Sequence, residues 1–146
     1  MQQFQVRRFR NIVDSGVINV QDDVTCLVGM NEAGKSAILT ALARLNPAQP
    51  STFSVSEDYP RWLKTADQRA GVIEEVTPIA ATFLLEPEDR KKIGGVFGDG
   101  VLLSDEVILS RHYDDGTLYC ACRSTTRRRS ATSSKRRTCL RRWLLN

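Results

Sequence analysis

The chain has few of the residues that build metal centres or disulfide frameworks. It holds one histidine, His112, and four cysteines, Cys26, Cys120, Cys122 and Cys139. Only one residue separates Cys120 from Cys122, whereas paired zinc ligands usually have two or more residues between them and a second pair elsewhere. We therefore expect no metal centre of cysteine and histidine. We expect Cys26 to be a reduced thiol in a buried strand, and His112 to be an exposed strand residue without a catalytic partner.

Long apolar runs are also missing. No run approaches the ~20 residues that a membrane-spanning helix needs. The first eight residues lack the apolar centre of a signal peptide. A length of 146 residues, with 41% hydrophobic and 26% charged residues, is typical of one modest soluble domain. These features predict a cytoplasmic protein with no membrane partner.

Acidic residues are missing from the last part of the sequence. From Arg123 onward there are nine basic side chains and no acidic one, so the first 122 residues hold 12 basic and 17 acidic residues and a net charge of −5. This basic segment is rich in arginine, serine and threonine and has no helix or strand period. The sequence therefore predicts a folded acidic domain over 1–122 and a disordered tail over 123–146.

The sequence does contain one strong motif. Residues 29–36 read Gly-Met-Asn-Glu-Ala-Gly-Lys-Ser and fit G-x-x-x-x-G-K-[ST], the phosphate-binding P-loop or Walker A motif. Residues 23–28 precede it as a short apolar segment, expected to be a core strand. Residues 36–45 follow it as an expected amphipathic helix that ends near Asn46. Strand, glycine loop and helix in this order are the context that the motif needs.

Each position of the motif has a physical role. Gly29 and Gly34 allow backbone conformations closed to other residues, so the amides of residues 31–36 can form a concave nest of donors. Lys35 can reach the β- and γ-phosphates, and the Ser36 hydroxyl can bind a Mg²⁺ ion that bridges them. The sequence therefore predicts a site for ATP and Mg²⁺ formed by Gly29, Asn31, Glu32, Ala33, Gly34, Lys35 and Ser36, with Ser36 as the metal ligand.

Other elements follow from periodicity and turn residues. A first strand carries Phe4 and Val6 and runs into a bend at 9–12, and a turn at Ser15–Gly16 leads to a second strand at 17–20. Residues 47–60 read as a loop, and a short helix begins near Arg61. The expected later elements are a strand at 78–85, a short helix at 88–93, and a hairpin of strands 106–113 and 117–122 around an Asp-Asp-Gly turn. The helix after the P-loop is expected to bury Ile38, Leu39, Leu42 and Leu45.

The bend Phe-Arg-Asn-Ile at 9–12, the strand at 17–20 and the segment 27–36 together resemble the N-terminal lobe of ABC-type ATPases of the RecF and SMC group. The Asn-Glu-Ala-Gly-Lys-Ser form of the loop is most similar to OLD-family, AAA-like ATPase-nucleases. The resemblance is specific over residues 1 to about 47. It implies an α/β P-loop lobe with an antiparallel β-subdomain. It also implies a role in DNA repair, DNA maintenance or phage defence, and dimers that enclose two ATP molecules.

Hydrolysis by this chain is not predicted. The family's Leu-Ser-Gly-Gly-like signature does not occur in the sequence, and there is no room for a Toprim nuclease domain. Residues 101–106 resemble a Walker B strand, in which Asp105 would bind Mg²⁺ and Glu106 would activate water. However, Ser104 interrupts the apolar run and Glu106 begins another strand, so we interpret this segment as a junction in the β-subdomain.

Two explanations remain for the basic segment. Its arginines can bind nucleic acid through phosphate contacts, which makes a non-enzymatic nucleic-acid-binding protein the alternative function. The abrupt change of composition instead favours a truncated or frameshifted product of a longer ATPase gene.

Overall fold

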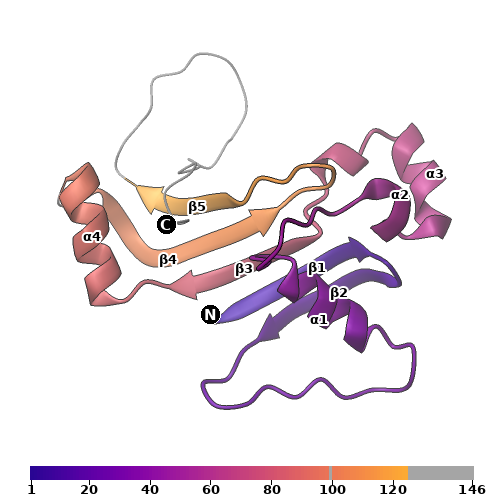
Figure 1. The fold of residues 1–146 in the computed structure, drawn as a ribbon, viewed down its shortest axis with the longest axis horizontal. Coiled ribbons are helices and arrows are strands. Elements are labelled where there is room, and N and C mark those ends of the chain that lie inside the picture. The colour runs from indigo at the N-terminus through magenta and orange to yellow at the C-terminus, as the bar shows by residue number, and fades with distance from the viewer. Residues whose placement is uncertain (99, 125–146) are drawn as a thin grey trace.

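The centre of the protein is a five-stranded antiparallel sheet with the strand order β2-β1-β3-β4-β5 (Figure 1). The computed structural model describes residues 1–98 and 100–124. The strands are β1 Gln3–Phe9, β2 Ile12–Asn19, β3 Ile79–Leu84, β4 Leu102–Arg111 and β5 Tyr119–Ser124. Strands β1 and β3 are adjacent although some 70 residues separate them in the sequence, with Val6 opposite Ile79 and Phe4 opposite Ala81. The protein is thus mixed α/β, with every strand pair of the sheet antiparallel.

One short helix covers a face of the sheet and the others lie at its two ends. They are α1 Lys35–Ala43, α2 Val55–Asp58, α3 Arg61–Arg69, the 3-10 helix η1 Ile73–Glu75, and α4 Pro87–Phe97. Helix α1 packs against β1, α2 and α3 lie at the end of the sheet where β1 turns into β2, and α4 lies at the opposite end (Figure 1). No helix within residues 1–98 and 100–124 has the length and apolar character required to cross a membrane.

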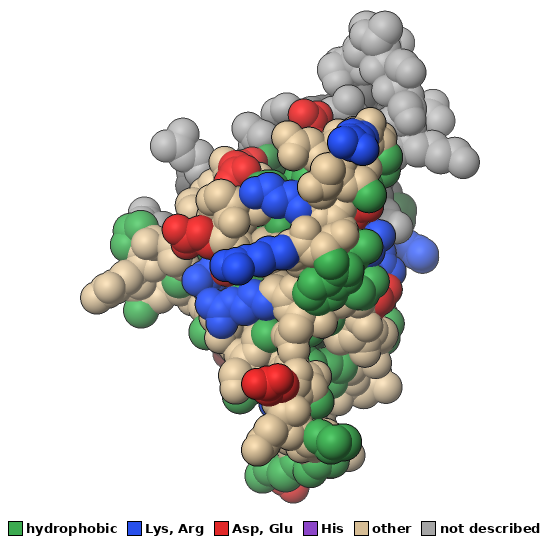
Figure 2. Space-filling model, turned by 90° about the vertical axis from the view of Figure 1, so that its right-hand side faces the viewer, with side chains coloured by type: hydrophobic (Ala, Val, Ile, Leu, Met, Phe, Trp, Pro, Cys, Tyr) green, Lys and Arg blue, Asp and Glu red, His purple; other side chains and the backbone are tan. Residues whose placement is uncertain are grey.

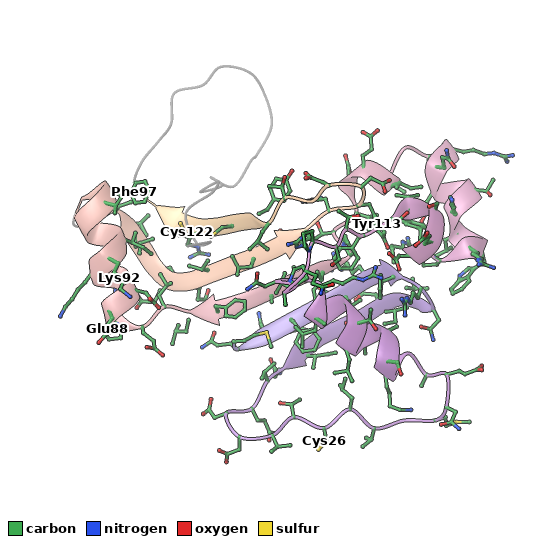
Figure 3. The ribbon with its side chains drawn as sticks, viewed as in Figure 1. Cys26, Glu88, Lys92, Phe97, Tyr113 and Cys122 are labelled. Atoms are coloured by element: carbon green, nitrogen blue, oxygen red, sulfur yellow. The ribbon has the colours of Figure 1, made fainter. Side chains whose placement is uncertain are left out.

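The core lies on the sheet face that α1 covers. Strand residues Phe4, Val6 and Ile79 are buried there. They continue into an aromatic cluster, in which the ring of Phe53 packs edge-on against Phe9, with 5.4 Å between ring centroids, and against Tyr113 at 6.2 Å. The side chain of Tyr113 points into this interior (Figure 3). The segment 47–60, expected to be a loop, supplies Phe53 to this core and contains α2.

The stripe expected for helix α1 is confirmed in part, and Leu39 is its exception. Ala37, Ala41 and Leu45 are buried, Ile38 and Leu42 are half-buried, and Leu39 is 57% exposed. The small alanine side chains let the helix approach β1 closely, and this rotates Leu39 toward solvent. Apolar periodicity indicated Ile38, Leu42 and Leu45 but not the two buried alanines, because alanine carries little hydrophobic signal.

The expected core strand at 23–28 is wrong, so the described residues have no strand before the glycine loop and the expected order of strand, loop and helix is not found. Residues 20–34 form an extended connection without regular structure, and 23–28 pair with no strand in the described part of the chain. Val24 and Val28 are 67% and 89% exposed. Cys26 is exposed rather than buried, and its side chain points away from the sheet (Figure 3). A strand needs a neighbour to satisfy its backbone groups, and the nearest described strand, β2, pairs only with β1.

Ser15 and Gly16 form a bulge within β2, not the expected turn. The pairing shifts between Gln5, opposite Val17, and Arg7, opposite Asp14, so that two residues of β2 face Val6 alone. Gly16 has a φ of 65°, and the Ser15 hydroxyl accepts a hydrogen bond of 3.0 Å from the Val6 amide. A glycine with positive φ is typical of such bulges. The chain reverses earlier, at Arg10 and Asn11.

The later elements confirm the sequence prediction. Strand β3, helix α4 and the β4–β5 hairpin all form where they were expected, give or take a few residues. His112 was expected to be an exposed strand residue, but it is half-buried and lies just after β4, because its ring packs edge-on to Tyr119 at 4.8 Å between centroids. Strand β5 includes Arg123 and Ser124, so it passes the expected domain boundary. Cys139 and the rest of the basic segment lie outside the described residues.

Candidate functional site

The P-loop residues lie together at the start of α1. Helix α1 begins at Lys35, directly after Gly34 in a left-handed conformation with φ 93°. A Cβ atom at Gly34 would lie 3.1 Å from Cγ1 of Ile12 and 3.4 Å from Oδ1 of Asn11. The position therefore requires glycine for its dihedral angles and for the close approach of the β1–β2 turn.

Lys35 folds back over the loop. Its Nζ donates hydrogen bonds to the carbonyl oxygens of Gly29, at 2.7 Å, and of Met30, at 2.6 Å. The ammonium group is thus fixed above the loop and beside the start of the helix. Carbonyl oxygens satisfy its charge only in part, and phosphate oxygens would form stronger, charge-assisted bonds with the same group.

The first turn of α1 has free backbone donors. No side chain caps the helix, and its first helical bond runs from the Ile38 amide to the Gly34 carbonyl at 2.9 Å. The amides of Lys35, Ser36 and Ala37 precede that bond and have no carbonyl within the helix to accept from them. They carry the positive end of the helix dipole, which favours an anion at this position.

The remaining motif residues face solvent. Asn31, Glu32, Ala33 and Ser36 are exposed, so a nucleotide can reach the loop without rearrangement of the core. Glu32 has a φ of 63°, an uncommon conformation for a residue with a side chain. The bond from Lys35 to the Gly29 carbonyl and the 3.3 Å bond from the Ala33 amide to the Met30 carbonyl bring the two ends of the predicted set together.

Asn11 is the neighbour that sequence reasoning missed. Its Nδ2 donates a 2.7 Å hydrogen bond to the carbonyl oxygen of Glu32, 21 residues away. The sequence indicated only that Asn11 lies in a bend, which is where asparagine is common. No local pattern links a turn to a loop on another segment.

A buried carboxylate lies at the same end of the molecule. Asp58 is only 3% exposed and accepts a 2.6 Å bond from Nη1 of Arg44, while Nε of Arg10 lies 3.6 Å from its other oxygen. Arg44 and Arg10 also lie over the ring of Phe9. Lys and Arg side chains gather in a band across this end of the molecule, which carries α3 and the β1–β2 turn (Figure 2).

Asp105 and Glu106 lie at the other end of the sheet. Both are inside β4, and Asp105 forms an ion pair of 2.6 Å with Arg90 of α4. Glu106 is opposite Leu84, whereas Arg111, at the end of the sheet near the P-loop, is opposite Ile79. Five residues along a strand correspond to about 17 Å, so these carboxylates lie far from Lys35 and Ser36.

A separate pocket of about 410 Å³ opens between the β1–β2 hairpin and residues 72–77. Its lining includes Arg7, Arg8, Asp14 and Glu75 and none of the P-loop residues. Both signs of charge are present, and Nε of Arg7 lies 3.3 Å from Oδ2 of Asp14. The arginine charge is therefore partly neutralised within the pocket itself.

Comparison with protein-family models, with curated proteins and with solved structures gives no match for this chain.

Proposed function

We propose that residues 29–36 bind ATP with Mg²⁺, and that the chain is an ATP-binding lobe of the RecF, SMC and OLD type. The single observation that carries the proposal is the position of Lys35, whose ammonium group is held 2.6–2.7 Å from two loop carbonyls beside the uncapped start of α1. A cation beside the loop, followed directly by amides that have no partner within the helix, is a combination that suits a β-phosphate.

The exposed apolar residues next to the loop support the proposal that this chain is one lobe of a larger ATP-binding assembly. Val28 and Met30 are 89% and 85% exposed, and Leu39 of α1 is 57% exposed. Exposed large apolar side chains beside a polar site are typical of a surface that is covered in an assembly. A second copy or further protein sequence would cover them and complete the site.

We propose that this chain binds ATP but does not hydrolyse it. A water-activating carboxylate must lie within hydrogen-bond reach of the reacting water. The only Walker B-like pair, Asp105 and Glu106, lies at the opposite end of the sheet and is occupied in part by Arg90.

Titration of the protein with a fluorescent ATP analogue tests the proposal. Lys35→Ala removes the cation over the loop and should weaken binding roughly 10- to 100-fold, the value of a charge-assisted hydrogen bond. Ser36→Ala should remove the dependence of binding on Mg²⁺. Lys92→Ala is the matched control, because Lys92 is exposed on α4 and points away from the sheet (Figure 3).

The control variant should bind the analogue as the wild type does. Equal affinity of wild type and Lys35→Ala would overturn the proposal, provided that the two unfold at the same temperature.

A further inference from the structure

The β1–β2 turn next to the loop is held in a strained conformation. Arg10 and Asn11 form the turn between the paired residues Phe9 and Ile12, and Arg10 has a φ of 52°. A residue with a side chain adopts such a φ only where its surroundings fix it. Here the Arg10 amide donates a 2.5 Å bond to the carbonyl oxygen of Asp58.

The turn contacts the P-loop at two points. Nδ2 of Asn11 lies 2.7 Å from the carbonyl oxygen of Glu32, the loop residue with positive φ. Ile12 and the Asn11 side chain also lie so close to Gly34 that a Cβ atom there would be within 3.1–3.4 Å of both. The loop is therefore supported from one side by the turn, between Glu32 and Gly34.

The far end of α1 is linked to the same turn. Arg44, the residue after the helix, donates to Asp58 at 2.6 Å, and Asp58 contacts Arg10 of the turn. Both ends of the helix that follows the loop are thus fixed against Arg10 and Asn11. This arrangement determines where the first amides of α1 point relative to the loop.

We propose that Asn11 is a positioning residue for the nucleotide site, and this inference rests on the proposed function. Its amide holds the Glu32 carbonyl on the side of the turn, so the Ala33 amide of the same peptide group points the opposite way. There the Ala33 amide donates a 3.3 Å bond to the Met30 carbonyl, which also accepts from Lys35. Without this bond the loop samples more conformations. The bound state then requires additional ordering, which weakens affinity without removing any contact to the ligand.

The test compares Asn11→Ala with Gln5→Ala. Gln5 is the matched control, because its Nε2 also makes an exposed 2.7 Å side-chain bond, to Asp14 of the same hairpin, without contact to the loop. Two quantities are measured: the affinity for the fluorescent ATP analogue, and, without nucleotide, the backbone ¹H–¹⁵N heteronuclear NOE of Glu32, Ala33 and Gly34.

Asn11→Ala should weaken the affinity about fivefold and lower the NOE of the three loop amides, and Gln5→Ala should change neither. Loop NOE values in Asn11→Ala equal to those of the wild type would overturn the inference, as would an equal effect of Gln5→Ala. The NOE measurement needs no ligand, so it decides the role of Asn11 even where the wild type binds no ATP analogue. That last result would refute only the proposed function.

Discussion

At the scale of single residues, Tyr59 connects the aromatic core to a pair of charges. It is 2% exposed, and its hydroxyl donates a 2.6 Å bond to Oδ2 of Asp67. The same carboxylate oxygen lies 3.4 Å from Nε of Arg8. Burial, reinforced by the hydrogen bond to Asp67, raises the pKa of Tyr59 to about 12.

This shift predicts a loss of stability in alkali. Between the usual tyrosine pKa of about 10 and the folded value of about 12, the unfolded chain releases the Tyr59 proton and the folded chain retains it. The free energy of unfolding should therefore fall as the pH rises through this window. Urea unfolding of wild type and Tyr59→Phe at pH 9, 10 and 11 measures the effect.

The phenylalanine variant should be less stable at pH 9, because it lacks the bond to Asp67, and should lose less stability between pH 9 and 11. Equal slopes in the two proteins would contradict the assignment.

The residues of the candidate site differ in how far sequence reveals them. Lys35, Ser36 and Gly34 were predicted because their spacing in one short segment is itself the signal. Asn11 and Asp58 were not predicted. Asn11 contacts a residue 21 positions away and Asp58 contacts a residue 14 positions away, and such contacts leave no periodic pattern in the sequence. A sequence motif identifies the residues expected to touch a ligand. It does not identify the residues that hold the motif in place.

At the scale of elements, close packing of α1 on β1 depends on small side chains. Ala41 is fully buried and Ala37 is 6% exposed, whereas Ala43 on the same helix is exposed. The loop precedes this helix directly, so the approach of helix to strand also sets the distance between Gly34 and the β1–β2 turn.

Ala41→Leu should therefore destabilise the protein by about 1–3 kcal/mol, the usual effect of overpacking a filled core. Ala43→Leu adds the same atoms on the exposed side and should change the free energy of unfolding by less than about 0.5 kcal/mol. Urea unfolding followed by circular dichroism compares the two variants. An equal loss of stability in both would contradict the observed helix face.

Elements with a local signal were predictable, and elements that need a distant partner were not. The Asp-Asp-Gly hairpin and helix α4 form where turn residues and Pro87 indicate. The apolar segment 23–28 has strand-like composition, but strand formation depends on a neighbour, and none of the described strands pairs with it. In the same way, Gly16 indicated a turn, although pairing on both sides made it a bulge.

At the scale of the whole molecule, the P-loop, the β1–β2 turn and the cluster of Asp58 with Arg10 and Arg44 lie at one end of the sheet, near α2 and α3 (Figure 1). The acidic pair of β4 and helix α4 occupy the other. A nucleotide at Lys35 would contact the first end alone. The antiparallel sheet in between links the two ends through β3, whose residues pair with both β1 and β4.

Nucleotide binding at residues 29–36 is tested most directly by amide chemical-shift mapping, in which ATP with Mg²⁺ is titrated into the ¹⁵N-labelled protein. Saturable shifts of the Gly29, Gly34 and Ser36 amides are predicted, and Lys35→Ala should need a roughly 10- to 100-fold higher nucleotide concentration to reach the same shifts. Absence of shifts in the loop would contradict the assignment. So would shifts confined to the pocket beside Arg7 and Glu75, where the site would then lie.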